Sequence, residues 1–443
     1  MKFPICTLMF LFTAGVFAHG QLAKETNHQP ISPDLTCSSA PCRLPNVKVT
    51  SGNKVTETAP NLAINPENSS QMIVGVTDTS CISWGATYHS SDGGTSWAKT
   101  CFPTVGIIDQ ISSIWMTYDS GGVVHALLGT INLDCGEDIL LESHSSDNGA
   151  TWSSLKQLSS VQFQVLDSEA MDDFAGSPFQ GNIYGSATEF LSNSVQIEVW
   201  TSADGGDTWI SHVAAKLPNT VFYDGEGYSH LEVGKDGTVY LAYMASVNGG
   251  PNEMMFSKSS DGGKTWISPV MVYTATPISD LPNTTIYVAD APIVAVDNSP
   301  AGTSRLYMTF YNWTGTFMQV LITHSDDSGT TWSSPVPVTP ENATNDQFKP
   351  YVSVSATGAV AVTWLDRRDD PNNTNYRAYA AISRKGVFTR NIALATASSI
   401  PMFGLSYNDS PPANAWSGST LLAVWPDTRK GTLLQVIGGY QQH

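Results

Sequence analysis

The sequence predicts an all-β protein: a β-propeller of four-stranded blades, with seven blades favoured and six as the alternative. Three observations support this fold class. A short motif recurs five times at a near-constant spacing, and short strand-like runs precede the copies. A further strand-like run lies ahead of the first copy, where it could close a ring of blades.

The repeated motif reads Ser-x-Asp-x-Gly-x-Ser/Thr-Trp, and its copies end at Trp97, Trp152, Trp209, Trp266 and Trp332. Ser and Asp side chains can bond backbone N–H groups a few residues on and so fold a tight turn. Glycine accepts a positive φ there without steric cost. We expect the Trp ring to pack between neighbouring sheets. The motif is therefore interpreted as a hairpin turn that builds the scaffold, and not as an active site.

The remaining units are found by their strand patterns. Runs such as Thr238–Ala245 are typical of propeller strands, with about four per repeat. Two units without a good motif follow the fifth copy, at Lys349–Ser383 and Phe403–Tyr440. The last of them ends after three strands. We expect Leu44–Thr50 to supply its missing outer strand and so to close the ring, because closure removes free strand edges.

The first residues are typical of a secretory signal peptide. Lys2 is followed by a mostly apolar run, Cys6–Phe17, and small residues precede a plausible cut after Ala18. The alternative, a membrane anchor, needs a longer apolar run of about 20 residues. We therefore expect a signal peptide at residues 1–18, an N-terminal extension at 19–42 and the propeller at 43–443, in a secreted, extracellular protein.

Glycosylation and disulfide signals agree with secretion. Six Asn-x-Ser/Thr sequons could carry glycans on exposed loops. They lie at Asn68, Asn283, Asn312, Asn342, Asn372 and Asn408. Cys81 and Cys101 flank a predicted hairpin and are the preferred disulfide. The partners of Cys37, Cys42 and Cys135 stay open, and their odd number leaves one thiol unpaired or paired between chains.

The charge balance excludes some partners. The net charge is −18, so the chain lacks the basic face that a nucleic-acid binder needs to neutralise phosphates. The same charge argues against docking on anionic lipid. We therefore expect neither nucleic acid nor membrane as a partner; the oligomeric state cannot be derived.

The five motifs resemble the Asp boxes of sialidases and the wider sialidase-like (BNR repeat) superfamily, across nearly the whole chain after the signal peptide. The resemblance implies a propeller and an oligosaccharide or glycoconjugate substrate. True sialidases also carry a Phe/Tyr-Arg-Ile-Pro motif, whose Arg joins a triad that holds the sialic acid carboxylate. The near match here is Cys42-Arg43-Leu44-Pro45, which precedes the expected closing strand. The Tyr–Glu nucleophile pair of sialidases would correspond to Tyr407 and Glu226.

Propeller topology places the candidate site where loops enter the innermost strands, on the same face as the loops that join second and third strands. Acidic residues are frequent in these predicted loops. Hydrolysis of a glycoside needs two carboxyl groups, one of them held protonated, and arginines can bind a sugar carboxylate with two hydrogen bonds. The candidate catalytic residues are Asp172, Asp173, Glu226 and Tyr407. The candidate substrate-binding residues are Arg367, Arg368, Arg429, Asp109, Asp290 and Asp366.

Three functions remain open at this point. The first is a sialidase-like exo-glycosidase that removes terminal, perhaps acidic, sugars. The second is a polysaccharide lyase on the same scaffold, with a His or Tyr as the base. The third is a non-catalytic propeller that binds glycans or proteins. Pairs such as Asp366-Arg367 could equally be ion pairs of the scaffold. We expect no cofactor, although the carboxylates of the mouth could hold a structural Ca²⁺.

Overall fold

The protein is described here from a computed structural model. The structure describes residues 35, 39–50, 57–104, 109–132, 138–161, 164–191, 194–218, 229–246, 250–278, 280–284, 286, 288, 292–339, 343–383, 388, 390–401, 411–431 and 433–442. Within these ranges there are only strands, turns and loops, and no helix that could cross a bilayer is found there.

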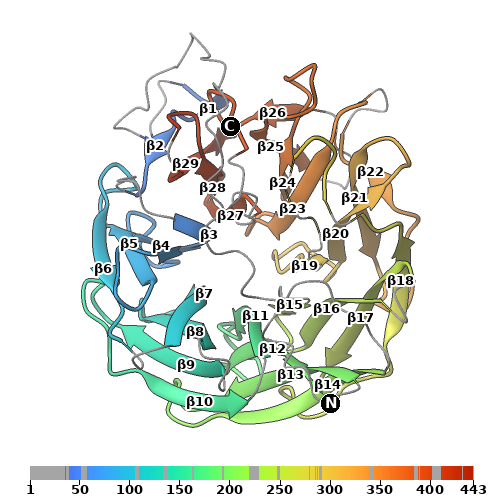
Figure 1. The fold of residues 1–443 in the computed structure, drawn as a ribbon. Helices are drawn as coiled ribbons and strands as arrows, with labels where there is room; N and C mark the ends of the chain where they lie inside the picture. The colour runs from blue at the N-terminus through green and yellow to red at the C-terminus, as the bar shows by residue number, and fades with distance from the viewer. Residues whose placement is uncertain are drawn as a thin grey trace, which may run out of the picture.

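The described strands form seven antiparallel sheets arranged in a ring (Figure 1). Each sheet is one blade, numbered 1 to 7 here in the order of the innermost strands. These are β3 (Glu57–Ile64), β7 (Asp109–Tyr118), β11 (Gln164–Met171), β15 (Ser229–Val233), β19 (Ile293–Val296), β23 (Gln347–Val354) and β27 (Ala413–Ser417). The predicted seven-bladed propeller is therefore confirmed.

The middle strands of the blades follow in chain order. The second strands are β4 (Met72–Asp78), β8 (Val124–Asn132), β12 (Ile183–Phe190), β16 (Val239–Ala245), β20 (Leu306–Trp313), β24 (Val360–Asp366) and β28 (Thr420–Asp427). The third strands are β5 (Gly85–Ser90), β9 (Asp138–Ser145), β13 (Ser194–Ser202), β17 (Asn252–Ser259), β21 (Met318–Ser325), β25 (Arg377–Ser383) and β29 (Leu434–Gln441).

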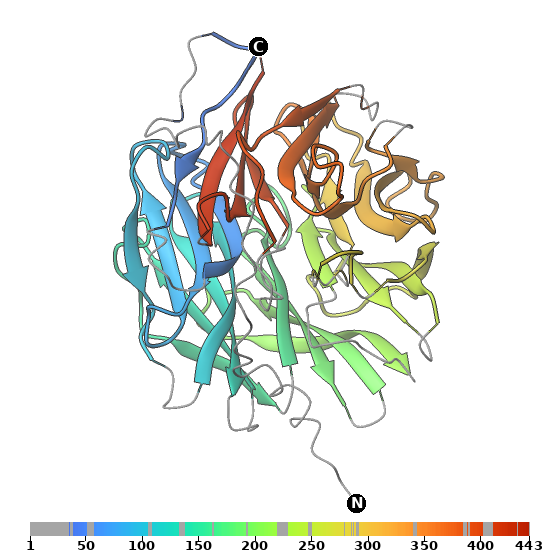
Figure 2. The ribbon, with the colours of Figure 1, turned by 45° about the horizontal axis from the view of Figure 1, so that its top comes forward.

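The outer strands of blades 1 to 6 lie on the rim of the ring. They are β6 (Ala98–Cys101), β10 (Lys156–Val161), β14 (Ile210–Pro218), β18 (Val270–Ala275), β22 (Val336–Pro337) and β26 (Asn391–Ala393). In blade 7 this position is taken by β1 (Cys42–Arg43) and β2 (Val47–Lys48), which both pair with β29. Figure 2 shows these N-terminal strands, in blue, against the red C-terminal ones. The expected closure by the N-terminal strand is confirmed.

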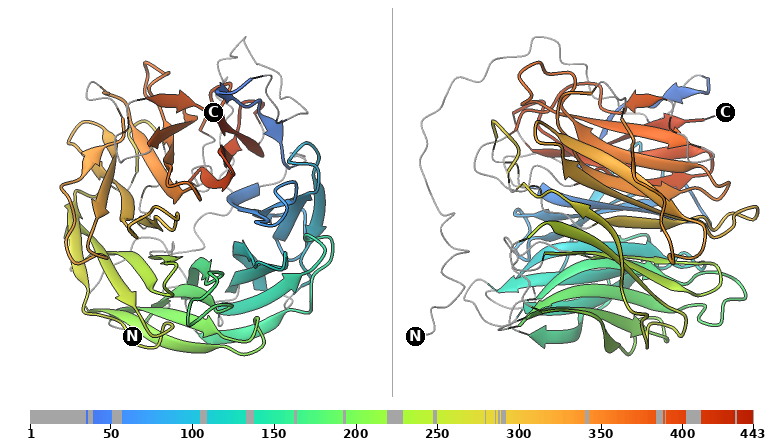
Figure 3. Two further views of the ribbon diagram at one scale, coloured as in Figure 1. Left: turned by 180° about the vertical axis from the view of Figure 1, so that it is seen from behind. Right: turned by 90° about the vertical axis from the view of Figure 1, so that its right-hand side faces the viewer.

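The core lies between the blades. The second strands are almost continuously apolar, as in β16, where all seven residues are buried. A strand has an almost continuously apolar sequence when both of its faces are covered by other parts of the protein. The apolar clusters join adjacent sheets, for example Val74 and Val76 of blade 1 with Val424 of blade 7. Seen from behind and from the side, the sheets stand around a common axis (Figure 3).

The five repeated motifs fold as turns between third and fourth strands. In the first copy the Ser90 hydroxyl accepts a bond from Gly94 N–H at 2.9 Å, and Asp92 accepts bonds from the Ser96 N–H at 2.9 Å and its hydroxyl at 2.6 Å. Gly94 has a φ of 86°, which only glycine adopts freely. The predicted turn is confirmed.

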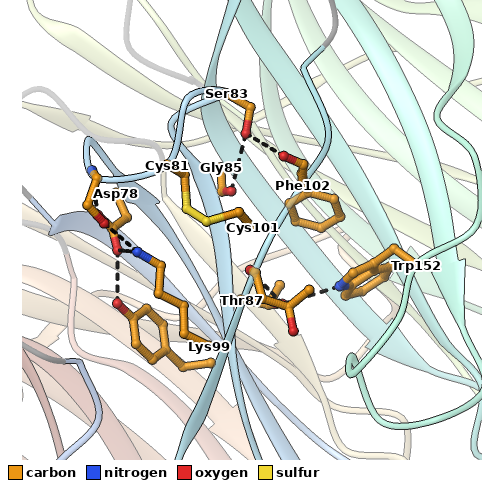
Figure 4. The surroundings of a disulfide bond; sticks show 12 residues. Asp78, Cys81, Ser83, Gly85, Thr87, Lys99, Cys101, Phe102 and Trp152 are labelled. Atoms are coloured by element: carbon orange, nitrogen blue, oxygen red, sulfur yellow. Dashed lines mark hydrogen bonds and ion pairs between the residues drawn. A yellow bond between two sulfur atoms is a disulfide. The ribbon is translucent and has the colours of Figure 1, made fainter.

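The motif's tryptophan also packs between blades, as predicted. Trp152 of blade 2 lies with its ring centre 4.8 Å from that of Phe102 and donates to the Thr87 hydroxyl at 3.2 Å, both in blade 1 (Figure 4). The predicted Cys81–Cys101 disulfide is present in the same region (Figure 4). Cys42 is also disulfide-bonded, while Cys37 and Cys135 lie outside the described residues.

The sequons can be compared with the expected loop positions. Asn68, Asn283 and Asn372 are exposed. Asn312 is half-buried at the end of β20, where its side chain accepts a bond from Thr276 N–H at 2.8 Å and donates to Trp313 O at 3.2 Å. The expectation of an exposed loop is thus wrong for Asn312. Asn342 and Asn408 lie outside the described residues.

Candidate functional site at the propeller axis

Four of the innermost strands contain a β-bulge. The pairing of β3, β7, β11 and β23 with their second strands each contains a shift of register. A bulge adds a residue and turns the side chains that follow it. In β7 and β23 an aromatic residue, Trp115 or Tyr351, lies at or just after the shift.

Three rings from alternate blades meet at the axis. The His230 ring of blade 4 lies 6.0 Å from that of Trp115 in blade 2 and 5.8 Å from that of Tyr351 in blade 6, in both cases edge to face. Blades 2, 4 and 6 are not neighbours, so these side chains can touch only inside the ring. Together with Glu232, two residues beyond His230 on β15, they form what we call the axial cluster.

The carboxyl group of Glu232 is the chemically unusual member of the axial cluster. Burial raises its pKa from 4.5 to about 7, and one hydrogen bond from Val233 N–H at 3.3 Å opposes that rise only weakly. Protein surrounds the group, yet Glu232 keeps some accessible surface, so it borders space that solvent can reach. A carboxyl group of this pKa can donate a proton at neutral pH.

His230 and Tyr351 are both neutral near pH 7. Burial lowers the pKa of His230 to about 4, and the residue is only 5% exposed. Its Nδ1 has no hydrogen-bond partner within the described residues. Burial raises the pKa of Tyr351 well above 10, and the charge of Glu232 raises it further. The axial cluster thus offers a protonated carboxyl, a neutral imidazole and a phenol beside two aromatic faces.

The proposed substrate-binding arginines are held by the scaffold. The Arg367 guanidinium is fully buried and donates to Asp346 at 2.9 Å and to Thr284 at 2.8 Å. Arg429 is buried beside Asp427, to which its Nε donates at 2.8 Å. Neither presents donors to a substrate, because its charge is already neutralised within the propeller. The ion-pair alternative is the one that the structure supports.

The third arginine is bound to its own loop and blade. Arg368 pairs with Asp366 at 2.5 Å and donates to Asn391 of the outer strand β26 at 2.9 Å. Its guanidinium also lies 4.5 Å from the centre of the Tyr379 ring. Asp366 is fully buried and accepts a second bond, from Trp364 Nε1, at 2.7 Å. The assignment of these two residues to substrate binding is not supported by their positions.

Asp172 and Asp173 lie on the opposite face of the ring from the predicted mouth. Both follow β11, so they belong to a loop between first and second strands, on the side of the repeated turns. The loop also lies against one of these turns. A Cβ atom placed on Gly262, in the turn of blade 4, would be 2.9 Å from the Phe179 ring of this loop. The Asp172 carboxylate is fully buried and accepts a bond from the Ser177 hydroxyl. Their expected position at the mouth is wrong.

The reason for this error is the composition of β11. The strand carries Asp167, Ser168 and Glu169, and such polar residues do not suggest an inner strand. Two of the three bond to blade 4: Asp167 accepts a hydrogen bond from the Ser229 hydroxyl, and Ser168 accepts one from Leu231 N–H at 2.9 Å. With β11 overlooked, the following loop was assigned to the wrong face.

Four other predicted residues cannot be placed. Glu226, Asp290 and Tyr407 lie outside the described residues, as does the side chain of Asp109 at the start of β7. They stay predictions. In the described ranges, no group of three His, Cys, Asp or Glu side chains could hold a metal ion.

The axial cluster itself was missed by sequence reasoning. His230 and Tyr351 both lie in strand-like runs and belong to no motif that marks them as functional residues. The available signal was their position: Trp115, His230 and Tyr351 each lie in the first strand of a unit, which is the strand next to the axis.

No family model matches the sequence, and no curated protein matches it. Among solved structures, the chain is similar to the Hadza microbial sialidase Hz136, with 14% identity, a TM-score of 0.48, and coverage of 72% of this chain and 66% of that one. It is similar to the intramolecular trans-sialidase from Ruminococcus gnavus, with 13% identity, a TM-score of 0.48, and coverage of 72% and 91%.

A third neighbour is the α-L-arabinofuranosidase Arb93A from Fusarium graminearum, with 13% identity, a TM-score of 0.44, and coverage of 74% of this chain and 92% of that one. The structural neighbours are thus sialidase and arabinofuranosidase propellers of low sequence identity. The match spans slightly less than two thirds of the length of Hz136. At this level the likeness concerns the fold alone.

Proposed function

We propose that the protein is a secreted glycosidase that removes terminal, possibly acidic, sugars, with the axial cluster as its catalytic centre. The observation that carries the proposal is the Glu232 carboxyl group, which burial keeps protonated close to neutral pH. Such a group can protonate the oxygen of a leaving sugar, which is the general-acid step of glycoside hydrolysis.

The neighbouring groups fit a sugar in this position. Trp115 and Tyr351 are half-buried rings that a sugar can contact through its apolar C–H face. Hydrolysis also needs a second carboxylate or a nucleophile. We retain Glu226 and Tyr407 as the candidates for this role, and Asp109 and Asp290 as candidates for substrate binding, because all four fall at or before the starts of inner strands.

A lyase is the second candidate function, and the His230–Tyr351 contact favours it. A neutral imidazole can accept the proton beside a uronate, and a phenol can donate one to the leaving oxygen. The ring centres lie 5.8 Å apart, so a base and an acid lie next to each other at the axis. Such a reaction would give an unsaturated product that absorbs ultraviolet light.

One screen separates these functions. The full chain, Glu232→Gln and the exposed control Glu67→Gln would be given aryl glycosides and uronate polymers. A glycosidase releases the aryl group, and loss of the acid should lower turnover about 10²- to 10⁴-fold in Glu232→Gln but not in Glu67→Gln. A lyase raises ultraviolet absorbance instead.

Two results would contradict the proposal. If Glu232→Gln turned over a responsive glycoside as fast as the unchanged chain, Glu232 would not be the acid. If the protein acted on no substrate but retained glycan affinity in both variants, a binding propeller would be the better description.

A further inference from the structure

A pocket lies on the outer rim of the ring, where the N-terminal strands close it. Its volume is about 310 Å³, and it opens between the outer strands of blades 6 and 7. Arg43 on β1 and Tyr440 on β29 line one side, and Arg390 and Asn391 line the other. Figure 1 shows β1 and β26 next to each other on this part of the rim. We call this the closure pocket.

The charges of the closure pocket set it apart from the rest of the protein. The structure describes seven arginines, and five of these form ion pairs with aspartates. The two that have no ion pair within the described residues, Arg43 and Arg390, both line this pocket.

A second arginine lies near Arg43. Burial lowers the pKa of Arg43, and the nearby charge of Arg377 lowers it further. Arg377 itself is neutralised by Asp369 at 2.8 Å. Arg43 and Arg390 both line the cavity, and a bound anion would offset their positive charges. A guanidinium binds carboxylate or sulfate oxygens with two parallel hydrogen bonds.

The other walls of the pocket suit more than a bare anion. Tyr440 is half-buried and offers an aromatic face, and Ile392 and Ala393 offer apolar surface, whereas the Asn391 amide is already bonded to Arg368 and to Val338 O. The volume lies at the lower end of the range for small-molecule sites, about 300 Å³, which suits a short oligosaccharide. We propose that the closure pocket binds an acidic sugar, one that carries a carboxylate or a sulfate ester.

This site is separate from the axial cluster. Its residues come from the outer strands β1 and β26, the residue before β26, and the end of β29, whereas Glu232 and its neighbours come from the innermost strands. The proposal therefore does not depend on the catalytic function. A ligand in the pocket would contact β26 of blade 6 and β1 of blade 7 at once, so its binding would also stabilise the closed ring.

Calorimetric titration of the full chain tests the proposal. The probes are a glucuronate-containing disaccharide, a sulfated disaccharide, the uncharged parent disaccharide and inorganic sulfate. The proteins are the unchanged chain, Arg43→Gln, Arg390→Gln and the control Lys264→Gln, which removes one exposed positive charge from blade 4. Glu232→Gln reports on any binding at the axis.

We expect at least one acidic disaccharide to bind the unchanged chain and Lys264→Gln alike. Affinity should fall about tenfold or more in Arg43→Gln and Arg390→Gln. Arg390→Lys should recover the affinity only in part, because lysine lacks the planar guanidinium group that binds an oxyanion through two parallel hydrogen bonds. Which of the two disaccharides binds distinguishes carboxylate from sulfate. The uncharged parent should bind far more weakly.

Several outcomes would overturn the proposal. These are no binding of either acidic disaccharide, equal binding to the two arginine variants and the unchanged chain, or inorganic sulfate binding as tightly as the disaccharides. Both arginines are exposed, so the variants should fold, and equal unfolding midpoints without ligand would verify this. A variant that fails to fold would be replaced by Arg43→Lys or Arg390→Lys.

Discussion

Replacing Glu232 with glutamine should stabilise the protein, and only at the higher end of the pH range. The pKa of Glu232 rises from 4.5 to about 7 on folding because burial disfavours the carboxylate. A group whose folded pKa is raised adds stability at low pH and loses it as the pH rises through the folded value. The glutamine amide stays neutral throughout, so it avoids that loss.

The size of the stability difference follows from the pKa shift of Glu232. One pKa unit corresponds to about 1.4 kcal/mol, so the rise from 4.5 to about 7 corresponds to about 3 kcal/mol as an upper value. The free energies of unfolding of the two proteins should agree near pH 4. Between pH 4.5 and 7 the free energy of unfolding of Glu232→Gln should rise progressively above that of the unchanged chain. Above pH 7 the difference between the two proteins should be constant.

Urea unfolding at pH 4, 6 and 8, followed by tryptophan fluorescence, measures this difference. The exposed variant Glu67→Gln is the control, for which no such change with pH is expected. A Glu232→Gln advantage of the same size at every pH would show that packing, and not ionisation, is responsible. No advantage at pH 8 would show that Glu232 is ionised in the folded protein at little cost.

Three further predictions concern the scaffold, each checked by the free energy of unfolding. Asp147→Asn should cost about 1 kcal/mol at neutral pH, because Asp147 fixes its turn by hydrogen bonds that keep its pKa at about 2; equal stability would contradict this. Replacing both Cys81 and Cys101 with alanine should cost about 3 kcal/mol, since the bond closes a loop of sequence separation 20, and an unchanged urea midpoint would refute it. Arg367→Met should cost about 3–5 kcal/mol by leaving Asp346 buried without its partner, and Asp346→Leu in the same chain should recover part of that loss; a cost below 1 kcal/mol would argue against the pair.

The scaffold could be predicted from the sequence because its signals are local. A turn such as Ser90–Trp97 encodes its own hydrogen bonds within eight residues, and five copies give the period of the blades. The closing strand was also predictable, since the last unit lacked an outer strand that Val47–Lys48 supplies.

The site was harder to predict because it depends on distant strands. Trp115, His230 and Tyr351 are more than 100 residues apart from one another, and no local pattern brings them together. Their contact follows from the closure of the ring. The buried ion pairs of Arg367 and Arg429 were likewise ambiguous, because a sequence does not show whether a charged pair faces solvent or a neighbouring blade.

The most direct test of the axial cluster is the pKa of Glu232 itself. It can be followed by carbon-13 NMR of labelled glutamate carboxyl groups, with Glu232→Gln to assign the signal. A titration midpoint near pH 7 is the result that burial at the axis predicts. A midpoint near 4.5 would mean that the carboxyl is ionised at neutral pH, and the general-acid role would then have no physical basis.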